Sequence, residues 1–420
     1  MTRTRTRLLP AAVVTAVLAV STPAAVAAPS PAAPTPPLTK AAADALGRSI
    51  GTALAGSGAR TIAASVEVEG YGGVYRRNSA VAVPPASTQK SFTGLSVLLA
   101  VGPDTRLRTE VAAPATPVDG SLTGPLWLVG GGDPYLTVAQ LTALAAKVKA
   151  AGVTTVAGDL LLDDSRYDAR RSAAGWRPSF VPGQSGPLSA MALDRNRWRA
   201  DKAFLADPAL PAAARFRDLL KAAGVTVTGT VRRAPRPAEA ATVAVHESAP
   251  MSSVVSRALK ASDNFAAELL LKELGRTVRA DGSSAGGIVA ARQVLGALGV
   301  PVGPGADGSG LSSLDRQTPA GQVALLKAGR RSAVASSFRA ALPIGCVDGT
   351  LKTRLCGTAA AGRVHAKTGT LSGVRTLAGY TTTARGRVVT FAVQLSGVTD
   401  GTKALRAIDR AVVLLASNRS

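Results

Sequence analysis

The alternation of apolar and polar residues predicts a helix and two strands near the beginning of the chain. Residues 39–55 are rich in Ala and Leu and are typical of a helix, whereas residues 60–69 alternate in strand fashion. The turn residues Tyr71-Gly72-Gly73 then separate this strand from a second short one. After Pro84-Pro85, a helical pattern begins at Ser87.

The last third of the chain is predicted to contain helices followed by strands. The predicted helices are 251–260, 264–276, 285–298 and a closing helix at 401–417, and the predicted strands are Val364–Thr370, Val374–Thr382 and Arg387–Leu395. Since strands lie near both ends of the sequence, the order favours one sheet assembled from both ends of the chain. The middle of the chain would then be an insertion.

The predicted insertion is a mixed α/β region between about residues 105 and 245. Its clearest elements are a strand at Leu126–Val129, a helix at 137–151, a strand at Val156–Leu162, and proline-rich interruptions near 207–211 and 234–237. With 46% hydrophobic and 18% charged residues, the whole chain has a globular composition and is long enough for more than one domain.

The N-terminus has the form of a secretory signal peptide. Arg3, Arg5 and Arg7 precede the apolar run Leu8–Val20, and Ala25-Val26-Ala27 offers the small-x-small pattern of a cleavage site. The apolar run is shorter than the roughly 20 residues that a spanning helix needs. The sequence therefore predicts an exported protein, either extracellular, cell-wall associated or periplasmic. An uncleaved membrane anchor is the alternative.

The chain is strongly basic, with a formal net charge of +23, of which three arginines belong to the leader and leave +20. In an exported protein this charge argues against nucleic acid as a partner and favours an anionic cell-wall or membrane surface. The alternative is a solvated surface under compositional bias, because arginine is used throughout without a concentrated basic run.

The chain has two cysteines and two histidines, which limits the chemistry available to it. Cys346 and Cys356, ten positions apart in an exported chain, predict one disulfide, which would contribute roughly 2–3 kcal/mol by closing its loop. His246 and His365 are too few for a site built on several histidines, and neither has the setting of a Ser-His-Asp triad. We expect no metal and no cofactor.

Three short motifs in order carry the candidate chemistry. The first, Ser87-Thr88-Gln89-Lys90, places a hydroxyl and an amine on one face of a helix, one turn apart. A serine needs a base within hydrogen-bond reach to become a nucleophile, and a lysine serves only when it is neutral. Burial and a second cation, for which Lys367 is the candidate, would both lower the pKa of Lys90.

The other two motifs supply groups around this pair. In Ser262-Asp263-Asn264, the serine could relay a proton to the leaving amine and the asparagine could hold Lys90, while Asp263 would point away. Lys367-Thr368-Gly369-Thr370 fits a strand whose edge an extended substrate could join. The backbone N–H groups of Ser87 and Thr370 would form an oxyanion hole.

These motifs resemble those of the serine acyl-transferases that penicillin inhibits. The long interval between Ser87 and Ser262 makes the chain similar to the D-alanyl-D-alanine carboxypeptidase/endopeptidase family, the class C low-molecular-mass penicillin-binding proteins. Further stretches agree with this resemblance: Gly130-Gly131-Gly132-Asp133-Pro134, Leu162-Asp163-Asp164-Ser165, Asp307-Gly308-Ser309-Gly310-Leu311-Ser312 and Asp348-Gly349-Thr350-Leu351. One departure is Ser313, where the family often has arginine. The resemblance therefore does not predict how the pocket recognises the side chain of a stem peptide.

The resemblance implies a fold and a domain plan. The fold is a β-lactamase/transpeptidase-like α/β (α+β) domain, with a five-stranded antiparallel sheet flanked by helices and interrupted by an inserted α/β region. The plan is a signal peptide at 1–27, a Pro/Ala linker at 28–38, a serine acyl-transferase domain formed by 39–104 with 246–420, and an inserted accessory region at 105–245.

The resemblance also implies an activity and roles for individual residues. The activity is serine-type D-Ala-D-Ala carboxypeptidase action, with endopeptidase action on cross-links as a companion, on peptidoglycan stem peptides, with β-lactam antibiotics as covalent inhibitors. The implied catalytic residues are Ser87 as acylated nucleophile, Lys90 as base, Ser262 and Asn264 as relay and support, and Lys367. The implied substrate-binding residues around the substrate carboxylate are Thr368, Gly369 and Thr370.

Two other functions remain open at this stage. A β-lactamase shares the three motifs, but in class A enzymes it deacylates with a separate glutamate, and no Glu-x-x-Leu-Asn segment lies between the second and third motifs. A penicillin-sensing or wall-binding protein would be acylated without turnover. The intact Lys90 and Lys367 count against this second alternative.

Overall fold

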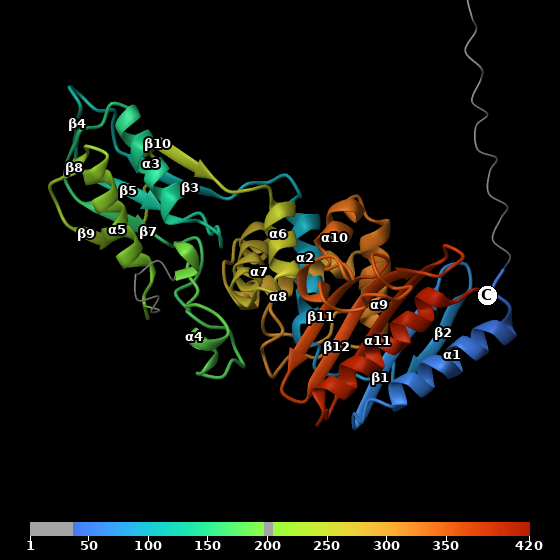
Figure 1. The fold of residues 1–420 in the computed structure, drawn as a ribbon. Coiled ribbons are helices and arrows are strands. Elements are labelled where there is room, and N and C mark those ends of the chain that lie inside the picture. Colours follow the sequence, from blue (N-terminus) through green and yellow to red (C-terminus); the bar gives the residue numbers. More distant parts are fainter. Residues whose placement is uncertain (1–36, 197–204) are drawn as a thin grey trace, which may run out of the picture. The chain divides into compact units, whose positions relative to one another are not determined.

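A five-stranded antiparallel sheet joins the two ends of the chain (Figure 1). The structure is a computed structural model, and it describes residues 37–196 and 205–420. The predicted signal peptide and most of the predicted linker lie outside the described residues.

The sheet has the strand order β11-β12-β13-β1-β2, and every neighbouring pair is antiparallel. Its strands are β1 (Thr61–Val68), β2 (Gly72–Arg77), β11 (His365–Leu371), β12 (Val374–Thr382) and β13 (Val388–Ser396). The prediction of one sheet built from both ends of the chain is therefore confirmed. It leaves β11, the strand with the third motif, at an edge.

Two hydrophobic cores lie on the opposite faces of this sheet, because successive strand residues point to opposite sides. On β12, Leu377 belongs to the core under the terminal helices α1 (Lys40–Ala55) and α11 (Gly401–Ser417). Its neighbour Ala378 belongs to the second core, which the remaining helices of this part of the chain cover. These are α2 (Gln89–Ala100), α6 (Met251–Lys260), α7 (Asn264–Arg279), α8 (Ser284–Gly296), α9 (Pro319–Arg331) and α10 (Ala335–Ala341).

The region between α2 and α6 forms its own α/β layers with a separate core. One sheet has the order β10-β3-β5-β7-β9 and a smaller, parallel one the order β4-β6-β8. The strands are β3 (Arg108–Ala113), β4 (Ser121–Thr123), β5 (Leu126–Val129), β6 (Thr155–Ala157), β7 (Leu160–Asp163), β8 (Thr226–Val227), β9 (Val231–Arg233) and β10 (Ala241–Glu247). The helices are α3 (Val138–Ala150), α4 (Phe180–Gly183) and α5 (Ala209–Ala222), and the short 3₁₀ turn η2 (Asp194–Asn196) also lies in this region. The 3₁₀ turns η1 (Ala86–Thr88) and η3 (Gly349–Leu351) lie outside it.

The prediction of a single strand at Val156–Leu162 is wrong. The segment contains two strands, β6 and β7, which belong to different sheets. Gly158 separates them at a point where the backbone of Gly124 passes so close that a side chain would collide with its carbonyl oxygen. Asp159 then accepts hydrogen bonds from Thr230 and Arg232. A continuous apolar run therefore conceals a change of sheet.

The proline-rich interruption predicted near 207–211 is the beginning of helix α5. Pro208 is its N-cap and Pro211 lies in its first turn, where the missing N–H of proline costs no hydrogen bond. Helix α9 was not predicted either, although Thr318 is its N-cap and Pro319 is its first residue. In both cases proline starts a helix that the apolar pattern alone did not reveal.

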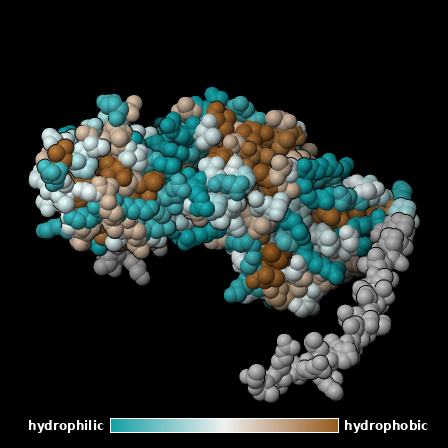
Figure 2. All heavy atoms as spheres, turned by 90° about the horizontal axis from the view of Figure 1, so that it is seen from above, coloured by the Kyte–Doolittle hydropathy of each residue, from teal (hydrophilic) through white to brown (hydrophobic). Residues whose placement is uncertain are grey.

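Among the described residues, no helix is long and apolar enough to cross a membrane. On the face shown in Figure 2, apolar residues gather in small areas between hydrophilic ones.

Candidate active site

The structure brings the three predicted motifs to one place. Ser87 lies in η1, directly before helix α2, which carries Lys90. Asn264 is the first residue of α7 and Ser262 lies in the turn before it. Lys367 comes from the edge strand β11, which contacts η1. Hydrogen bonds from Lys90 to Asn264 and from Lys367 to Ser262 connect these segments.

Lys90 lies at the centre of the cluster. Its side chain is fully buried, and its Nζ is 3.0 Å from Ser87 Oγ, 2.7 Å from Asn264 Oδ1 and 2.6 Å from the carbonyl oxygen of Ser309. These three acceptors match the three N–H donors of an ammonium group. When the amine is neutral, it can instead accept a proton from the Ser87 hydroxyl.

The surroundings of Lys90 bring its pKa close to neutral pH. Burial lowers the pKa of Lys90 from 10.5 to about 8, against the opposing influence of the nearby carboxylates of Asp307, Asp263 and Glu268. A substantial fraction of the amine is therefore neutral near pH 8. This is the state that a general base requires.

Lys367 is the second buried amine of the site. Its Nζ donates to Ser262 Oγ at 2.9 Å and to the carbonyl oxygen of Thr368 at 2.9 Å. Burial and then the charge of Lys90 hold the pKa of Lys367 well below its usual value. The sequence predicted that Lys367 would lower the pKa of Lys90. The structure shows the opposite effect: the charge of Lys90 lowers the pKa of Lys367, and burial is what lowers the pKa of Lys90.

Ser262 is held in a strained backbone conformation between α6 and α7. Its φ of 54° lies in the left-handed region, which is uncommon for a residue with a side chain. The next residue, Asp263, caps α7 by accepting from the amide of Ala266 and pairs with Arg195 at 2.9 Å. Asp263 therefore faces away from Lys90, as predicted, and Asn264 faces toward it.

The edge strand β11 lies directly against the nucleophile. A Cβ at Gly369 would be 3.0 Å from the amide nitrogen of Ser87 and would collide with Thr376 Oγ1. Thr376 in turn donates to the carbonyl oxygen of Pro85, next to the loop of Ser87. Only a residue without a side chain fits at 369.

The backbone of Thr370 faces the open edge of the sheet. In an antiparallel strand, the N–H groups of every second residue point to the same side. Since the Ala366 amide points away from β12 and donates to Pro343, the Thr370 amide also points outward. On the same strand, Thr368 Oγ1 lies 2.7 Å from Thr350 Oγ1.

The loop 307–312, which accepts a hydrogen bond from Lys90, was given no role from the sequence. Ser309 supplies the third acceptor of Lys90, and Asp307 holds the loop in place. The Asp307 carboxylate accepts from the backbone amides of Ser309, Gly310, Leu311 and Ser312, from Ser309 Oγ and from the Trp176 indole. An aspartate followed by glycine and serine predicts such a turn, but it does not predict that Lys90 donates a hydrogen bond to the backbone of this turn.

Two further buried carboxyl groups accompany Asp307. Burial, with the neighbouring Asp307 as the next cause, raises the pKa of Asp315 to about 10, so Asp315 is protonated at neutral pH. Burial, with Asp307 as the next cause, raises the pKa of Glu268 to about 7. Glu268 accepts from Ser284 Oγ at 2.6 Å and from the Gly308 amide at 2.8 Å.

The region between α2 and α6 reaches the site directly. Asn264 donates through Nδ2 to the carbonyl oxygen of Gln184, and Trp176 donates to Asp307. Ser313, the departure from the resemblance, is exposed, and its amide donates to Gly175 at 3.3 Å. The region between α2 and α6 thus contacts the segments that hold Lys90.

The remaining candidates from the sequence lie outside this cluster. His365 Nε2 lies 3.1 Å from an Arg339 nitrogen, and burial lowers the pKa of His365. Among the described residues, no group of three or more His, Cys, Asp or Glu side chains could hold a metal ion.

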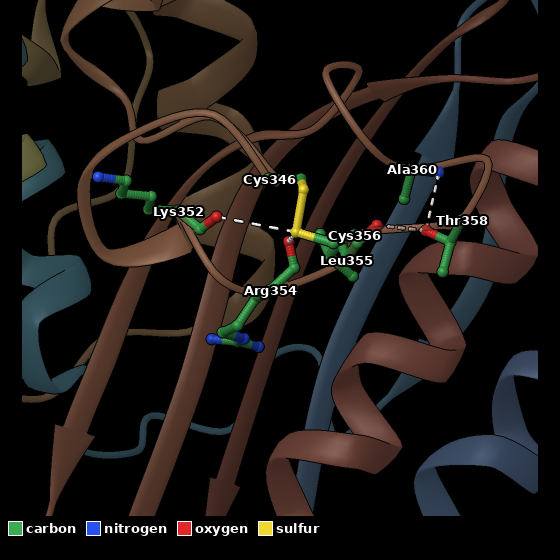
Figure 3. The surroundings of a disulfide bond; sticks show 7 residues. All are labelled: Cys346, Lys352, Arg354, Leu355, Cys356, Thr358 and Ala360. Carbon is green, nitrogen blue, oxygen red and sulfur yellow. Dashed lines mark hydrogen bonds between the residues drawn. A yellow bond between two sulfur atoms is a disulfide. The ribbon is translucent and has the colours of Figure 1, made fainter.

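Cys346 and Cys356 form a disulfide in the loop that precedes β11 (Figure 3). Cys356 Sγ faces the carbonyl oxygens of Lys352 and Arg354. Arg354 is paired with Asp409 of α11 at 2.6 Å. The disulfide therefore closes the loop, and the Arg354–Asp409 ion pair connects it to helix α11.

Comparison with known proteins gives a consistent result. Residues 52–203 and 200–419 match the model of the D-Ala-D-Ala carboxypeptidase 3 (S13) family. A D-alanyl-D-alanine carboxypeptidase of Actinomadura sp. (strain R39) is 31% identical over 73% of this chain and 72% of that protein. A carboxypeptidase of Mycobacterium tuberculosis is 31% identical over 76% of this chain and 72% of its own length. Penicillin binding protein 4 from Haemophilus influenzae shares the fold, with a TM-score of 0.78 at 23% identity over 86% of this chain and 97% of that chain.

Proposed function

Because the chain belongs to the D-Ala-D-Ala carboxypeptidase 3 (S13) family, we propose that it removes the terminal D-Ala from peptidoglycan stem peptides through an acyl-enzyme on Ser87. The observation that carries this proposal is the 3.0 Å contact between Ser87 Oγ and the fully buried Lys90 amine. The family match and the carboxypeptidase relatives support the substrate class.

In the acylation step, Ser87 Oγ attacks the carbonyl carbon of the penultimate D-Ala. The hydroxyl proton passes to neutral Lys90, and the bond between Ser87 and the acyl group forms. The N–H groups of Ser87 and Thr370 stabilise the oxyanion that develops, since both lie where β11 approaches η1.

The leaving D-Ala needs a proton on its nitrogen. Ser262 is suited to deliver it, because its hydroxyl accepts from Lys367 and can pass its own proton to the leaving nitrogen. The proton that Lys90 took from Ser87 replaces the proton lost by Ser262, so that Lys90 is neutral again. The C–N bond then breaks and leaves the acyl group on Ser87. Water hydrolyses this ester with Lys90 as base, which restores the Ser87 hydroxyl.

The substrate is placed by the edge of β11. Its terminal carboxylate would lie near Lys367, Thr368 and Thr370, while its extended backbone pairs with the strand, as in other β-augmentation complexes. A β-lactam presents an amide and a carboxylate in a similar arrangement and would acylate Ser87 as a covalent inhibitor. In support, a structure of the Haemophilus influenzae protein is a complex with a β-lactam.

The domain plan follows from the same assignment. We propose that residues 39–104 and 246–420 form the acyl-transferase domain and that residues 105–245 form an accessory insertion. The separate core of the insertion supports this division. Removal of the leader at 1–27 and export to the cell wall, where stem peptides occur, complete the proposal.

Intact-mass analysis after penicillin treatment tests the nucleophile. The parent protein should gain the mass of one penicilloyl group, and Ser87→Ala should gain none. Ser91→Ala is a matched control, because Ser91 lies one position after Lys90 in helix α2 and its hydroxyl has no hydrogen-bond partner among the described residues. An adduct that persists in Ser87→Ala would refute the assignment.

The products distinguish this function from the two alternatives. Steady release of D-Ala from a peptide ending in D-Ala-D-Ala, together with a long-lived penicilloyl adduct, supports the carboxypeptidase. Rapid hydrolysis of penicillin would indicate a β-lactamase. Acylation without D-Ala release would indicate a penicillin-sensing or wall-binding protein.

A further inference from the structure

A large groove runs between the terminal helices α1 and α11, which pack against each other. Its volume is about 1190 Å³, and it is lined mainly by apolar surface. We call it the α1–α11 groove and define it by Arg48, Thr52, Leu355, Arg406, Arg410 and Leu414. None of these residues takes part in the proposed catalysis.

Three positive charges on this groove have no counter-charge. Arg48, Arg406 and Arg410 are exposed, and within residues 37–196 and 205–420 none of them has an ion-pair partner. The carboxylate that lines the groove, Asp409, is already paired with Arg354 at 2.6 Å. The groove therefore offers three guanidinium groups to an anion, and guanidinium is well suited to phosphate.

The floor between the arginines is apolar. Leu414 is 36% exposed, and Val413 and Leu355 line the groove beside it. The wall that carries Leu355 is held by the Cys346–Cys356 disulfide. An apolar floor with cationic margins matches a molecule that combines a hydrocarbon part with a phosphate. A purely polar phosphate polymer would leave the apolar floor without a partner.

The groove and the proposed active site lie on different faces of the central sheet. Helices α1 and α11 cover the core that contains Leu377, whereas α2 and α7, which carry Lys90 and Asn264, cover the core that contains Ala378. A ligand in the groove therefore leaves Ser87 accessible. Substitutions in the groove should leave acylation intact.

We propose that the α1–α11 groove binds an anionic phospholipid and so holds the protein against a membrane surface. The acyl part lies over Leu355 and Leu414, and the phosphate meets Arg48, Arg406 and Arg410. The positive charge of the whole chain adds a long-range attraction to such a surface. This inference goes beyond the proposed function and does not depend on it.

Vesicle cosedimentation of residues 37–420, which form a compact unit with their own cores, tests the proposal. The parent should bind vesicles of phosphatidylcholine with phosphatidylglycerol and not pure phosphatidylcholine. The triple variant Arg48→Gln, Arg406→Gln, Arg410→Gln should bind roughly 100-fold more weakly, because three charges near an anionic surface are lost.

A second triple variant separates the groove from general charge. Arg77, Arg279 and Arg331 are exposed on β2, α7 and α9 and have no ion-pair partner among the described residues. Changing them to Gln removes the same charge and should weaken vesicle binding much less. Equal weakening in both triple variants would overturn the groove as the site.

A substitution in the floor separates lipid from phosphate polymer. Leu414→Asp should weaken binding to the anionic vesicles, because it places a charge on the apolar floor. If the protein instead binds a soluble glycerol-phosphate polymer as tightly as vesicles, and Leu414→Asp changes neither, the lipid assignment is overturned. A far-UV circular dichroism spectrum equal to that of the parent shows that each variant remains folded.

Discussion

Lys90 can act as a base in the proposed mechanism because burial lowers its pKa and nearby carboxylates limit how far it falls. Burial favours the neutral amine, whereas Asp307, Asp263 and Glu268 favour the ammonium ion. The three acceptors around Nζ fix the amine beside Ser87 in either state. At the scale of single residues, the proposed reactivity of Ser87 is therefore set by the groups that surround Lys90.

The rate of acylation should rise with pH through the pKa of Lys90. That pKa is lowered from 10.5 to about 8, and only the neutral amine accepts the Ser87 proton. The second-order rate constant for penicillin should therefore increase up to about pH 8 and level off above it. Stopped-flow acylation measured across this pH range checks the prediction, and a rate that falls between pH 7 and pH 9 would contradict it.

Glu268→Gln should move the same profile toward lower pH. The Glu268 charge raises the pKa of Lys90, so its removal lowers that pKa. The amide can still accept from Gly308 and can donate to Ser284, which keeps the local contacts. A profile displaced toward higher pH would show that the carboxylate does not act through its charge.

At the scale of elements, the proposed site depends on the close approach of β11 to η1. Gly369 permits this approach, since a Cβ there would meet Thr376 Oγ1 and the Ser87 amide. The strained φ of Ser262 similarly lets the turn between α6 and α7 present its hydroxyl to Lys367. At both contacts a single residue, Gly369 or Ser262, permits the approach of the two segments.

Gly369→Ala should reduce the acylation rate by roughly 100-fold, because a displacement of about 1 Å in a reacting geometry has an effect of this size. The matched control is Gly296→Ala in α8, where an added Cβ meets nothing within 4 Å. The control should acylate at the parental rate. Parental acylation in Gly369→Ala would show that β11 does not constrain the nucleophile.

At the scale of the whole molecule, the region between α2 and α6, which we propose to be an insertion, contacts α7 through several charged groups. Arg166 donates to both carboxylate oxygens of the buried Glu273, at 2.8 and 2.6 Å, and the Tyr167 hydroxyl donates to the same group at 3.0 Å. Arg195 pairs with Asp263 in the second motif, and Asp168 pairs with Lys272. These ion pairs connect the accessory layers to the helix that begins with Asn264.

Glu273→Gln should lower the free energy of unfolding by about 2 kcal/mol, because it removes the charge from a buried carboxylate that accepts hydrogen bonds from Arg166 and Tyr167. The exposed Glu239→Gln serves as the control and should change it by less than about 0.5 kcal/mol. Urea unfolding followed by circular dichroism measures both. Equal stability of the two variants would show that the Arg166–Glu273 pair does not hold the insertion.

Much of the fold was predictable because local patterns follow local physics. The closing helix at 401–417 and the strand at Val374–Thr382 match the structure residue for residue, since each carries a clear apolar period. The segment Val156–Leu162 failed for the opposite reason. Its apolar run continues through Gly158, and the change of sheet there depends on the passing backbone of Gly124.

The side chains that could form the proposed site were identifiable from the sequence, because Ser87, Lys90, Ser262, Asn264 and Lys367 carry chemistry in their own atoms. The groups that surround them could be found only in the folded chain. The carbonyl oxygens of Ser309 and Gln184 hold Lys90 and Asn264, and a carbonyl is the same in every residue. The groove between α1 and α11 likewise exists only after two helices from opposite ends of the chain pack on one sheet.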